Sequence, residues 1–497
     1  MDIFDAIRSD PRLDELIRLL TDDSDPVAAE GLWGSSAPIM AAIVAERLRR
    51  PLLFITAHGD EADDVRDDIE TATGTAPELL PQLETLSSEQ SAADELAGER
   101  LRLCVALSDD HGPGHDAGSG VGFLRAGARI PSRTDRADSI ETPPASIIVA
   151  PVQALMQPVP SPQAIAAQSI TVSVGQTLDP DRLVAWLSDQ GFTRCDQVEV
   201  GGDFSRRGGI VDVYGNAHTD PVRVEFLGDR VESIRLFDAG TQRSSHALRS
   251  VRIPALSMVG TQANGGRTTS LLALLPADTI IALHEPAEIQ ELGRTFWQRL
   301  GEPVGMISVD GLLRRANDFT QLYLQRFAGG AARSVNLDVG SLPQFEPKSA
   351  EALAALCELA AHDDVIVLCD NRPEEQRFQE LLAELPGQSE RIRTAVGVIH
   401  RGFRWSGSPA GSRCHTMIPA TAYVPHHELF HRYRQRRTLR RVQPARPIDS
   451  FFDLEMGDHV VHVLHGIGRF LGLKTLERAG RREEYLAIQF AGRAVVH

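Results

Sequence analysis

Apolar residues in the first part of the chain recur at helical spacing around one continuous apolar run. Residues 1–20 have the pattern of an amphipathic helix, and a second periodic helix at 39–48 leads into the run PLLFIT at 51–56. A third helix is expected at 61–72, with an acidic exposed face. An apolar strand between amphipathic helices is typical of an α/β layer with both faces covered.

The pattern changes to strict alternation between residues 206 and 237. Apolar side chains at 222, 224 and 226 alternate with polar ones, and Gly228-Asp229 is a hairpin turn signal. The segment therefore predicts three short strands, and an ordinary β-meander is one interpretation of it. A helix is expected just before, because Asp179-Pro180 can cap its start and Gly191 can end it.

Helix and strand patterns resume after Phe237. A strand at 279–286 and the helical segment PAEIQELGRTFWQRL indicate a second half of the first α/β layer, split by the inserted small domain. Residues 334–430 are interpreted as a separate small α/β domain, with a helix from Ser349 and a buried strand at 365–369.

Two segments lack an apolar period. Residues 108–145 are rich in Gly, Ser, Asp and Pro and are predicted to be a flexible insertion, in which His111 and His115 are solvent-exposed. Residues 431–455 are predicted to be a linker, and its first part, HRYRQRRTLRRVQPARP, is strongly basic. Contact with a polyanion and a solvated connector both remain open for this linker.

Composition places limits on partners and compartment. The 497 residues, 42% of them hydrophobic, can form about three to five ordinary domains. The net charge is −17, yet the residues from His431 onward hold 13 Lys and Arg against 7 Asp and Glu. An acidic body disfavours wrapping nucleic acid, whereas the basic end could meet it. Five cysteines without a CxxC pair fit a reduced, cytoplasmic setting. The sequence shows neither a signal peptide nor a membrane span, so no membrane partner is expected.

A glycine-rich turn, EGLWGSSA at 30–37, invites comparison with the phosphate loop GxxxxGK[ST]. When Gly31 is aligned with the first glycine of this motif, Ser36 stands in place of its last glycine. Ala37 then stands in place of the lysine, and Pro38 in place of the magnesium-binding Ser or Thr. Both groups that would hold the phosphates and the metal are missing. We therefore expect no nucleotide at this degenerate phosphate loop, whose residues are Gly31, Gly34, Ser35 and Ala37.

The words RGGIVDV, PVRVEFLGD, VESIR and FDAGTQRS, in this order, resemble a segment shared by the bacterial excision-repair protein UvrB and the transcription-repair coupling factors. The resemblance implies a multidomain α/β fold in which a degenerate phosphate-loop layer, at 1–145 and 225–333, is split by a small α+β domain. That domain, placed at 146–224, is implied to bind the excision-repair protein UvrA.

The same resemblance implies which residues contact UvrA. Two family phrases, a Gly-Tyr-Glu-Arg turn and an Arg-x-Arg-Gly strand start, align with residues 191–194 and 205–208. Ser205 replaces the first of the strand arginines, and its neighbour Arg206 could compensate. The implied contact residues are Arg194, Arg207, Arg206 and Phe192. A solvated surface group is the other interpretation of any of these arginines, although arginine is a frequent anchor at interfaces.

A second motif lies at 457–490, where short alternating strands surround the turn His465-Gly466-Ile467-Gly468. It resembles the RNA-polymerase-interacting domain shared by the coupling factors and the CarD transcription regulators. The resemblance implies a Tudor-like β-barrel at 456–497, left incomplete at His497. It also implies that a strand adds to the RNA polymerase β subunit through Lys474, Thr475 and Leu476, with Arg469 nearby. The alternating histidines His459, His462 and His465 belong to the family signature, so no metal is expected.

The resemblance covers the non-motor half of the coupling factors, because no intact phosphate loop and no DEAD-like acidic box occur in the chain. The expected function is therefore transcription-coupled nucleotide excision repair without catalysis: binding of stalled RNA polymerase and recruitment of UvrA. In the family, ATP and Mg²⁺ belong to the motor half, which also makes most of the DNA contact, so this chain needs no cofactor. The alternatives are a UvrB-like DNA-repair ATPase and a CarD-like transcription regulator.

Overall fold

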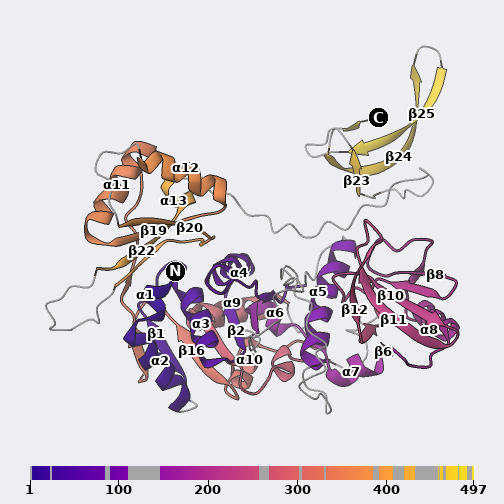
Figure 1. Ribbon diagram of the computed structural model, residues 1–497, viewed down its shortest axis with the longest axis horizontal. Helices are drawn as coiled ribbons and strands as arrows, with labels where there is room; N and C mark the ends of the chain where they lie inside the picture. The colour runs from indigo at the N-terminus through magenta and orange to yellow at the C-terminus, as the bar shows by residue number, and fades with distance from the viewer. Residues whose placement is uncertain are drawn as a thin grey trace. The chain divides into compact units, whose positions relative to one another are not determined.

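The computed structural model describes residues 3–22, 25–83, 90–109, 146–256, 268–300, 305–329, 332–346, 348–383, 391–406, 419–430, 457, 459–462, 466–478, 481–489 and 495–496. The chain divides into two compact units, Met1–Arg440 and Arg441–His497 (Figure 1). The predicted linker at 431–455 lies outside the described residues, and so does the predicted insertion from residue 110 to 145, with His111 and His115.

A seven-stranded parallel sheet with the order β17-β1-β16-β15-β2-β4-β3 forms the centre of the first unit. Its strands are β1 (Val27–Glu30), β2 (Leu52–Thr56), β3 (Glu78–Leu79), β4 (Ile147–Pro151), β15 (Ile280–His284), β16 (Thr320–Leu324) and β17 (Ser334–Asn336). Successive residues of β2 alternate between two apolar clusters, with Leu52 and Phe54 in one and Leu53 and Ile55 in the other. Burial on both faces explains the uninterrupted apolar run of this strand.

Helices contribute to both apolar clusters of this sheet. The first cluster includes residues of α1 (Asp5–Arg8), α2 (Pro11–Asp22), α3 (Ser36–Leu48) and α4 (Gly59–Thr73). The second includes residues of α5 (Gln90–Asp109), α6 (Val152–Met156), α7 (Pro162–Ala167), the 3₁₀ helix η2 (Leu271–Leu274), α9 (Pro286–Leu300) and α10 (Val309–Ala316). The short strands β5 (Val159–Pro160) and β14 (Thr268–Thr269) pair with each other. None of the described helices is long and apolar enough to cross a membrane.

A small β-rich module is inserted between β4 and β15. It consists of β6 (Ser169–Ser173), α8 (Pro180–Asp189), β7 (Thr193–Arg194), β8 (Asp203–Arg207), β9 (Ile210–Val213), β10 (Val222–Leu227), β11 (Arg230–Phe237), β12 (Ser244–Leu248) and β13 (Ser250–Pro254). Strands β7 to β12 form one sheet in the order β12-β11-β10-β9-β8-β7, and β6 pairs with β13. The Asp179 side chain caps α8, as the sequence predicted. The predicted domain boundary between residues 224 and 225 falls inside β10, so the module instead continues to β13.

A five-stranded mixed sheet with the order β18-β21-β22-β19-β20 completes the described part of the first unit. Its elements are β18 (Val339–Gly340), α11 (Ser349–His362), β19 (Asp364–Cys369), α12 (Arg372–Ala383), β20 (Ile392–Val396), β21 (Phe403–Trp405), β22 (Thr421–Pro425) and α13 (His426–Phe430). The interpretation of 334–430 as a separate domain needs correction in two respects. Strand β17 pairs with β1, and Trp405 and Tyr423 join the apolar cluster beside the seven-stranded sheet.

The second unit is a four-stranded antiparallel sheet with the order β23-β24-β25-β26. Its strands are β23 (His459–His462), β24 (Gly466–Arg478), β25 (Arg481–Gln489) and β26 (Val495–Val496). No pairing closes this sheet into a barrel within the described residues. The coarser prediction, a mixed α/β fold with several sheets, is confirmed.

Candidate functional sites

The degenerate phosphate loop connects the end of β1 to the start of α3. Gly31 and Gly34 have positive φ angles of 74° and 57°, so the chain turns sharply there. This turn lies at the carboxyl edge of the parallel sheet, where α/β proteins usually bind ligands. Ala37, which stands in the place of the motif's lysine, is buried and uncharged. The residues present therefore do not fit a nucleotide phosphate with its metal.

A loop at 397–402, between β20 and β21, fills the space in front of Gly34, whereas Asn336 and Asp338 lie in front of Gly31. Ser35 N donates a hydrogen bond to Arg401 O at 3.0 Å, and Arg401 N donates one to Ser35 Oγ at 3.0 Å. A Cβ atom on Gly34 would lie 2.6 Å from Gly402 O and 2.8 Å from Arg401 O. Backbone carbonyl groups thus take the position before the helix at which a phosphate loop holds phosphate oxygens.

His400, in the same loop, is surrounded by carboxylates of α4. Its Nδ1 lies 3.0 Å from an Asp64 oxygen, its Nε2 lies 3.3 Å from an Asp67 oxygen, and its backbone N–H donates to Asp68 Oδ1 at 2.9 Å. Burial raises the pKa of Asp68 to about 7. Burial by itself would lower the pKa of His400, but the Asp67 hydrogen bond and the charges of the three carboxylates raise it.

This His400 cluster was missed by sequence reasoning, which predicted an acidic exposed face for α4. Asp68 is in fact only 3% exposed. Its backbone donor lies 332 residues away along the chain, so no local pattern could have indicated the contact.

The four residues predicted to contact UvrA lie on the small module in different environments. Arg194, on the edge strand β7, and Arg207, at the end of β8, are exposed. Arg206 forms an ion pair with Asp181 at the start of α8. The prediction for Phe192 needs correction, because its side chain is only 5% exposed and packs in the apolar cluster of the module. It supports the edge strand from inside and does not present a contact surface.

Two apolar side chains near Arg207 are exposed and were not singled out from the sequence. Ile210 pairs with Arg207 across the β8–β9 hairpin, and Leu227, at the end of β10, is 72% exposed. A hydrogen bond from Phe226 N to Gly209 O at 2.7 Å holds the ends of the two hairpins together. The turn signals at both hairpins could have placed these side chains at strand ends.

The residues predicted to contact RNA polymerase lie on β24. Lys474, Thr475 and Leu476 pair with residues 483–485 of β25. On its other side β24 pairs with β23 only through residues 466–469. Among the described strands, the edge of β24 beside Leu476 therefore has no partner strand, and such an edge can accept another chain.

Arg469 lies outside this free edge. It pairs with His459 of β23 and is exposed, and its Nε donates to Gly457 O at 3.1 Å. His459 and His462 belong to β23, whereas His465 lies outside the described residues. Within the part of the chain that the structure describes, no group of three potential metal ligands comes together.

Two protein families match parts of the sequence. The UvrB interaction domain family matches residues 170–258, which extend from β6 to just past β13. The CarD-like/TRCF RID domain family matches residues 454–497, which include the four-stranded sheet.

Similarity to named proteins extends over most of the chain. The transcription-repair-coupling factor of Bacillus subtilis is 24% identical over 541 aligned residues, which cover 93% of this chain and 43% of that protein. The protein of the same name from Escherichia coli is 22% identical and covers 94% of this chain and 44% of its own length. The one from Mycobacterium bovis is 34% identical over 212 residues, which are 42% of this chain and 15% of that protein.

The chain thus spans less than half the length of these relatives. The two domain matches fall on the two motifs described in the sequence, at 206–237 and 457–490. Together with these two domain matches, the similarity along more than nine tenths of the chain makes it similar to part of the length of the transcription-repair-coupling factors.

Proposed function

We propose that this chain is the adaptor part of a transcription-coupled nucleotide excision repair factor, which binds RNA polymerase stalled at DNA lesions and recruits UvrA. The observation that carries the proposal is the presence of both domain types in one chain, at 170–258 and 454–497. The chain itself has no catalytic activity in this proposal. ATP-driven movement on DNA, with ATP and Mg²⁺ as cofactors, is proposed to belong to a separate motor part of the full-length proteins.

The UvrA surface is proposed to lie on the exposed hairpin end and edge strand of the small module. Arg194 and Arg207 supply exposed guanidinium groups, which pair well with carboxylates. Ile210 and Leu227 add exposed apolar area beside Arg207. Arginine next to apolar side chains is a frequent composition of protein contact sites.

The polymerase surface is proposed to be the free edge of β24. A strand of the polymerase β subunit would add beside residues 474–476, with main-chain hydrogen bonds supplying affinity and Leu476 supplying an apolar anchor. The absence of a partner strand at this edge among the described residues supports the proposal.

The degenerate phosphate loop is proposed to bind no nucleotide. The carbonyl groups of Arg401 and Gly402 in front of Gly34 support this, as does the buried Ala37. Isothermal titration with ATP and Mg²⁺ tests it, and saturable micromolar binding would favour the UvrB-like ATPase instead.

A binding experiment with purified UvrA and polymerase β subunit tests the two surfaces separately. We expect Arg194→Glu/Arg207→Glu to weaken UvrA binding at least tenfold and to leave polymerase binding unchanged, because an acidic patch repels the carboxylates that the arginines attract. Leu476→Arg should weaken binding of the polymerase β subunit and leave UvrA binding unchanged. The matched control Arg182→Glu/Arg249→Glu reverses two exposed charges elsewhere on the small module. It should bind both UvrA and the polymerase β subunit as tightly as wild type does. Equal UvrA binding by wild type and Arg194→Glu/Arg207→Glu would remove the site assignment, and no binding by wild type would remove the recruitment role.

A further inference from the structure

A hollow of about 500 Å³ lies beside α9 and α10, and its lining includes none of the residues used in the proposed function. Its lining comes from the end of α9, the segment before α10, α10 itself and the turn that follows it. The lining residues are Trp297, Met306, Ile307, Ser308, Gly311, Arg314, Arg315 and Asp318.

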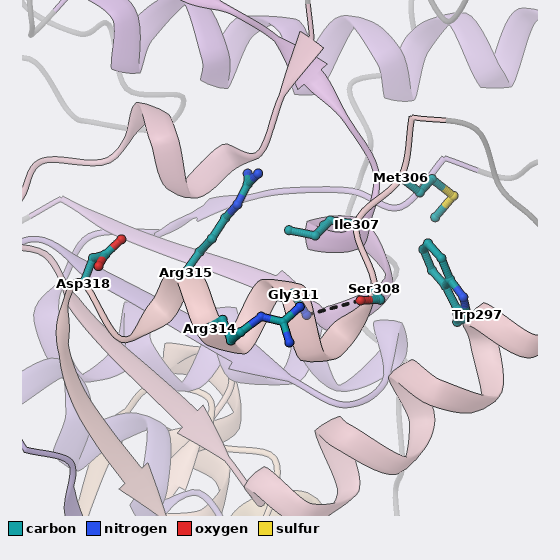
Figure 2. A pocket seen from close by; sticks show the side chains of 8 residues that line it. All are labelled: Trp297, Met306, Ile307, Ser308, Gly311, Arg314, Arg315 and Asp318. Atoms are coloured by element: carbon teal, nitrogen blue, oxygen red, sulfur yellow. Dashed lines mark hydrogen bonds between the residues drawn. The ribbon is translucent and has the colours of Figure 1, made fainter.

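The two ends of this hollow differ in chemistry, as Figure 2 shows. Trp297 and Met306 lie at one end, Arg314 and Arg315 lie on α10 in the middle, and Asp318 lies at the other end. The indole and the thioether are both partly exposed, so apolar area is available to a ligand. The hollow therefore offers an apolar wall next to two positive charges.

The two guanidinium groups are available for a ligand. Both arginines are exposed, and within the described part of the chain neither side chain forms a hydrogen bond or a close ion pair, although the charge of Arg314 acts on the nearby Asp310. The nearby carboxylate of Asp310 is already held by Arg294 at 3.1 Å and by Gln290 at 3.2 Å. Arg314 and Arg315 thus keep hydrogen-bond donors that match a carboxylate.

We propose that this hollow binds an acidic segment of a protein partner, with a carboxylate on Arg314 and Arg315 and a neighbouring apolar side chain against Trp297 and Met306. Trp, Met and Arg are among the residues enriched in protein interfaces, and a buried aromatic next to an arginine is typical of an energetic centre. The site adds a third contact surface to those of the proposed function and does not depend on them.

A nucleic acid is the less suitable occupant. Binding along a phosphate backbone needs several neutralising contacts, whereas the hollow offers two guanidinium groups and is bordered by Asp318.

The test is fluorescence anisotropy of the full chain with a fluorescein-labelled peptide of alternating glutamate and leucine. We expect saturable binding that Arg314→Glu/Arg315→Glu weakens at least tenfold and Trp297→Ala weakens several-fold. A peptide with serine in place of leucine should bind more weakly, because it loses the apolar contact. The charge-matched Arg182→Glu/Arg249→Glu should bind within twofold of wild type.

Thermal unfolding of each variant checks that the exposed substitutions leave the fold intact. Binding of UvrA and of the polymerase β subunit by Arg314→Glu/Arg315→Glu should equal that of wild type, which separates this site from the proposed function. The proposal is overturned if wild type does not bind the peptide, or if the double variant binds it equally well. Tighter binding of a labelled oligothymidylate than of the peptide, lost in Arg314→Glu/Arg315→Glu, would assign the hollow to nucleic acid.

Discussion

Gly34 lies just before α3 of the seven-stranded sheet, at the point where the loop at 397–402 of the five-stranded sheet contacts it. Its φ angle is positive, and the space of its missing side chain is taken by the carbonyl groups of residues 401 and 402. Gly74 has a similar φ of 70°, but a Cβ atom added there would have no neighbouring atom within 4 Å, so it offers a matched comparison. Substituting alanine at each glycine therefore distinguishes the cost of backbone strain, which both variants share, from the cost of steric contact, which only the Gly34 variant has.

We expect Gly34→Ala to lower the local stability of the contact between the loop at 397–402 and α3 by about 1–3 kcal/mol more than Gly74→Ala lowers the local stability around residue 74. Strain from the positive φ alone contributes only about 1 kcal/mol in both variants. Hydrogen exchange of the amides at 398–402 measures the local opening free energy. Equal exchange in the two variants would show that the carbonyl groups move aside freely.

Asp68 makes this contact sensitive to pH. Its folded-state pKa of about 7 lies above the ordinary value of 3.8, so its contribution to stability is complete below about pH 4 and is lost as the pH rises through about 7. The raised pKa of His400 acts in the same direction at higher pH. Stability conferred by this cluster therefore declines toward alkaline pH.

We expect Asp68→Asn to flatten the decline in urea stability between pH 5 and pH 8, because the amide keeps an acceptor for His400 N–H without a buried charge. Urea midpoints at pH 5, 6.5 and 8 measure this. Asp60→Asn, on the exposed first turn of α4, should keep the wild-type slope. Parallel pH profiles of wild type and Asp68→Asn would contradict the role of the cluster.

At the scale of elements, the start of α2 joins the five-stranded sheet to the seven-stranded one. Asp10 and Arg12 form a buried ion pair at 2.6 Å, and Asp10 Oδ2 also accepts a hydrogen bond from Trp405 Nε1 at 2.8 Å. Arg12 in turn donates to Leu337 O at 2.7 Å. One helix start thus holds side chains and backbone from both sheets.

Asp10→Ala should destabilise the first unit by about 3–5 kcal/mol, because it leaves the buried Arg12 without a counter-charge. Hydrogen exchange in β21 should accelerate, since Trp405 loses its acceptor. Asp5→Ala, an exposed change on the preceding helix α1, should alter stability by less than about 0.5 kcal/mol. Unchanged exchange in β21 in Asp10→Ala would show that apolar packing alone holds the sheet.

Helices and strands could be predicted from the sequence where a pattern of neighbouring residues determines them. The apolar run of β2, the cap at Asp179 and the alternation of β10 each depend on neighbours a few residues away. The pairing of β17 with β1 joins residues about 300 positions apart, and the burial of Phe192 depends on the packing of the whole module. Such long-range packing leaves no periodic signal, which is why the boundaries and one contact residue were wrong.

At the scale of the whole molecule, charge separates an acidic body from a basic end. The net charge of −17 repels DNA, whereas the residues from His431 onward hold 13 Lys and Arg against 7 Asp and Glu. The same composition that keeps DNA from the body leaves one segment able to attract it.

We expect the chain to retard duplex DNA weakly at about 50 mM salt and not at about 200 mM, because few phosphates are neutralised. Arg436→Gln/Arg437→Gln/Arg440→Gln/Arg441→Gln should abolish the low-salt shift in an electrophoretic mobility assay. The same number of changes at Arg182, Arg249, Arg299 and Arg372 should preserve it. Retention of the shift in the first variant would place DNA contact elsewhere.

The filling of the phosphate position by carbonyl groups has a consequence for how this layer can evolve. Because main-chain atoms of Arg401 and Gly402 occupy the position, no side-chain substitution in that loop removes them. A lysine in place of Ala37 and a serine in place of Pro38 would put a cation and a hydroxyl group opposite a peptide group instead of a nucleotide. The neighbouring sheet therefore occupies this position with its backbone, and changes of the side chains at 401 and 402 alone would not open it.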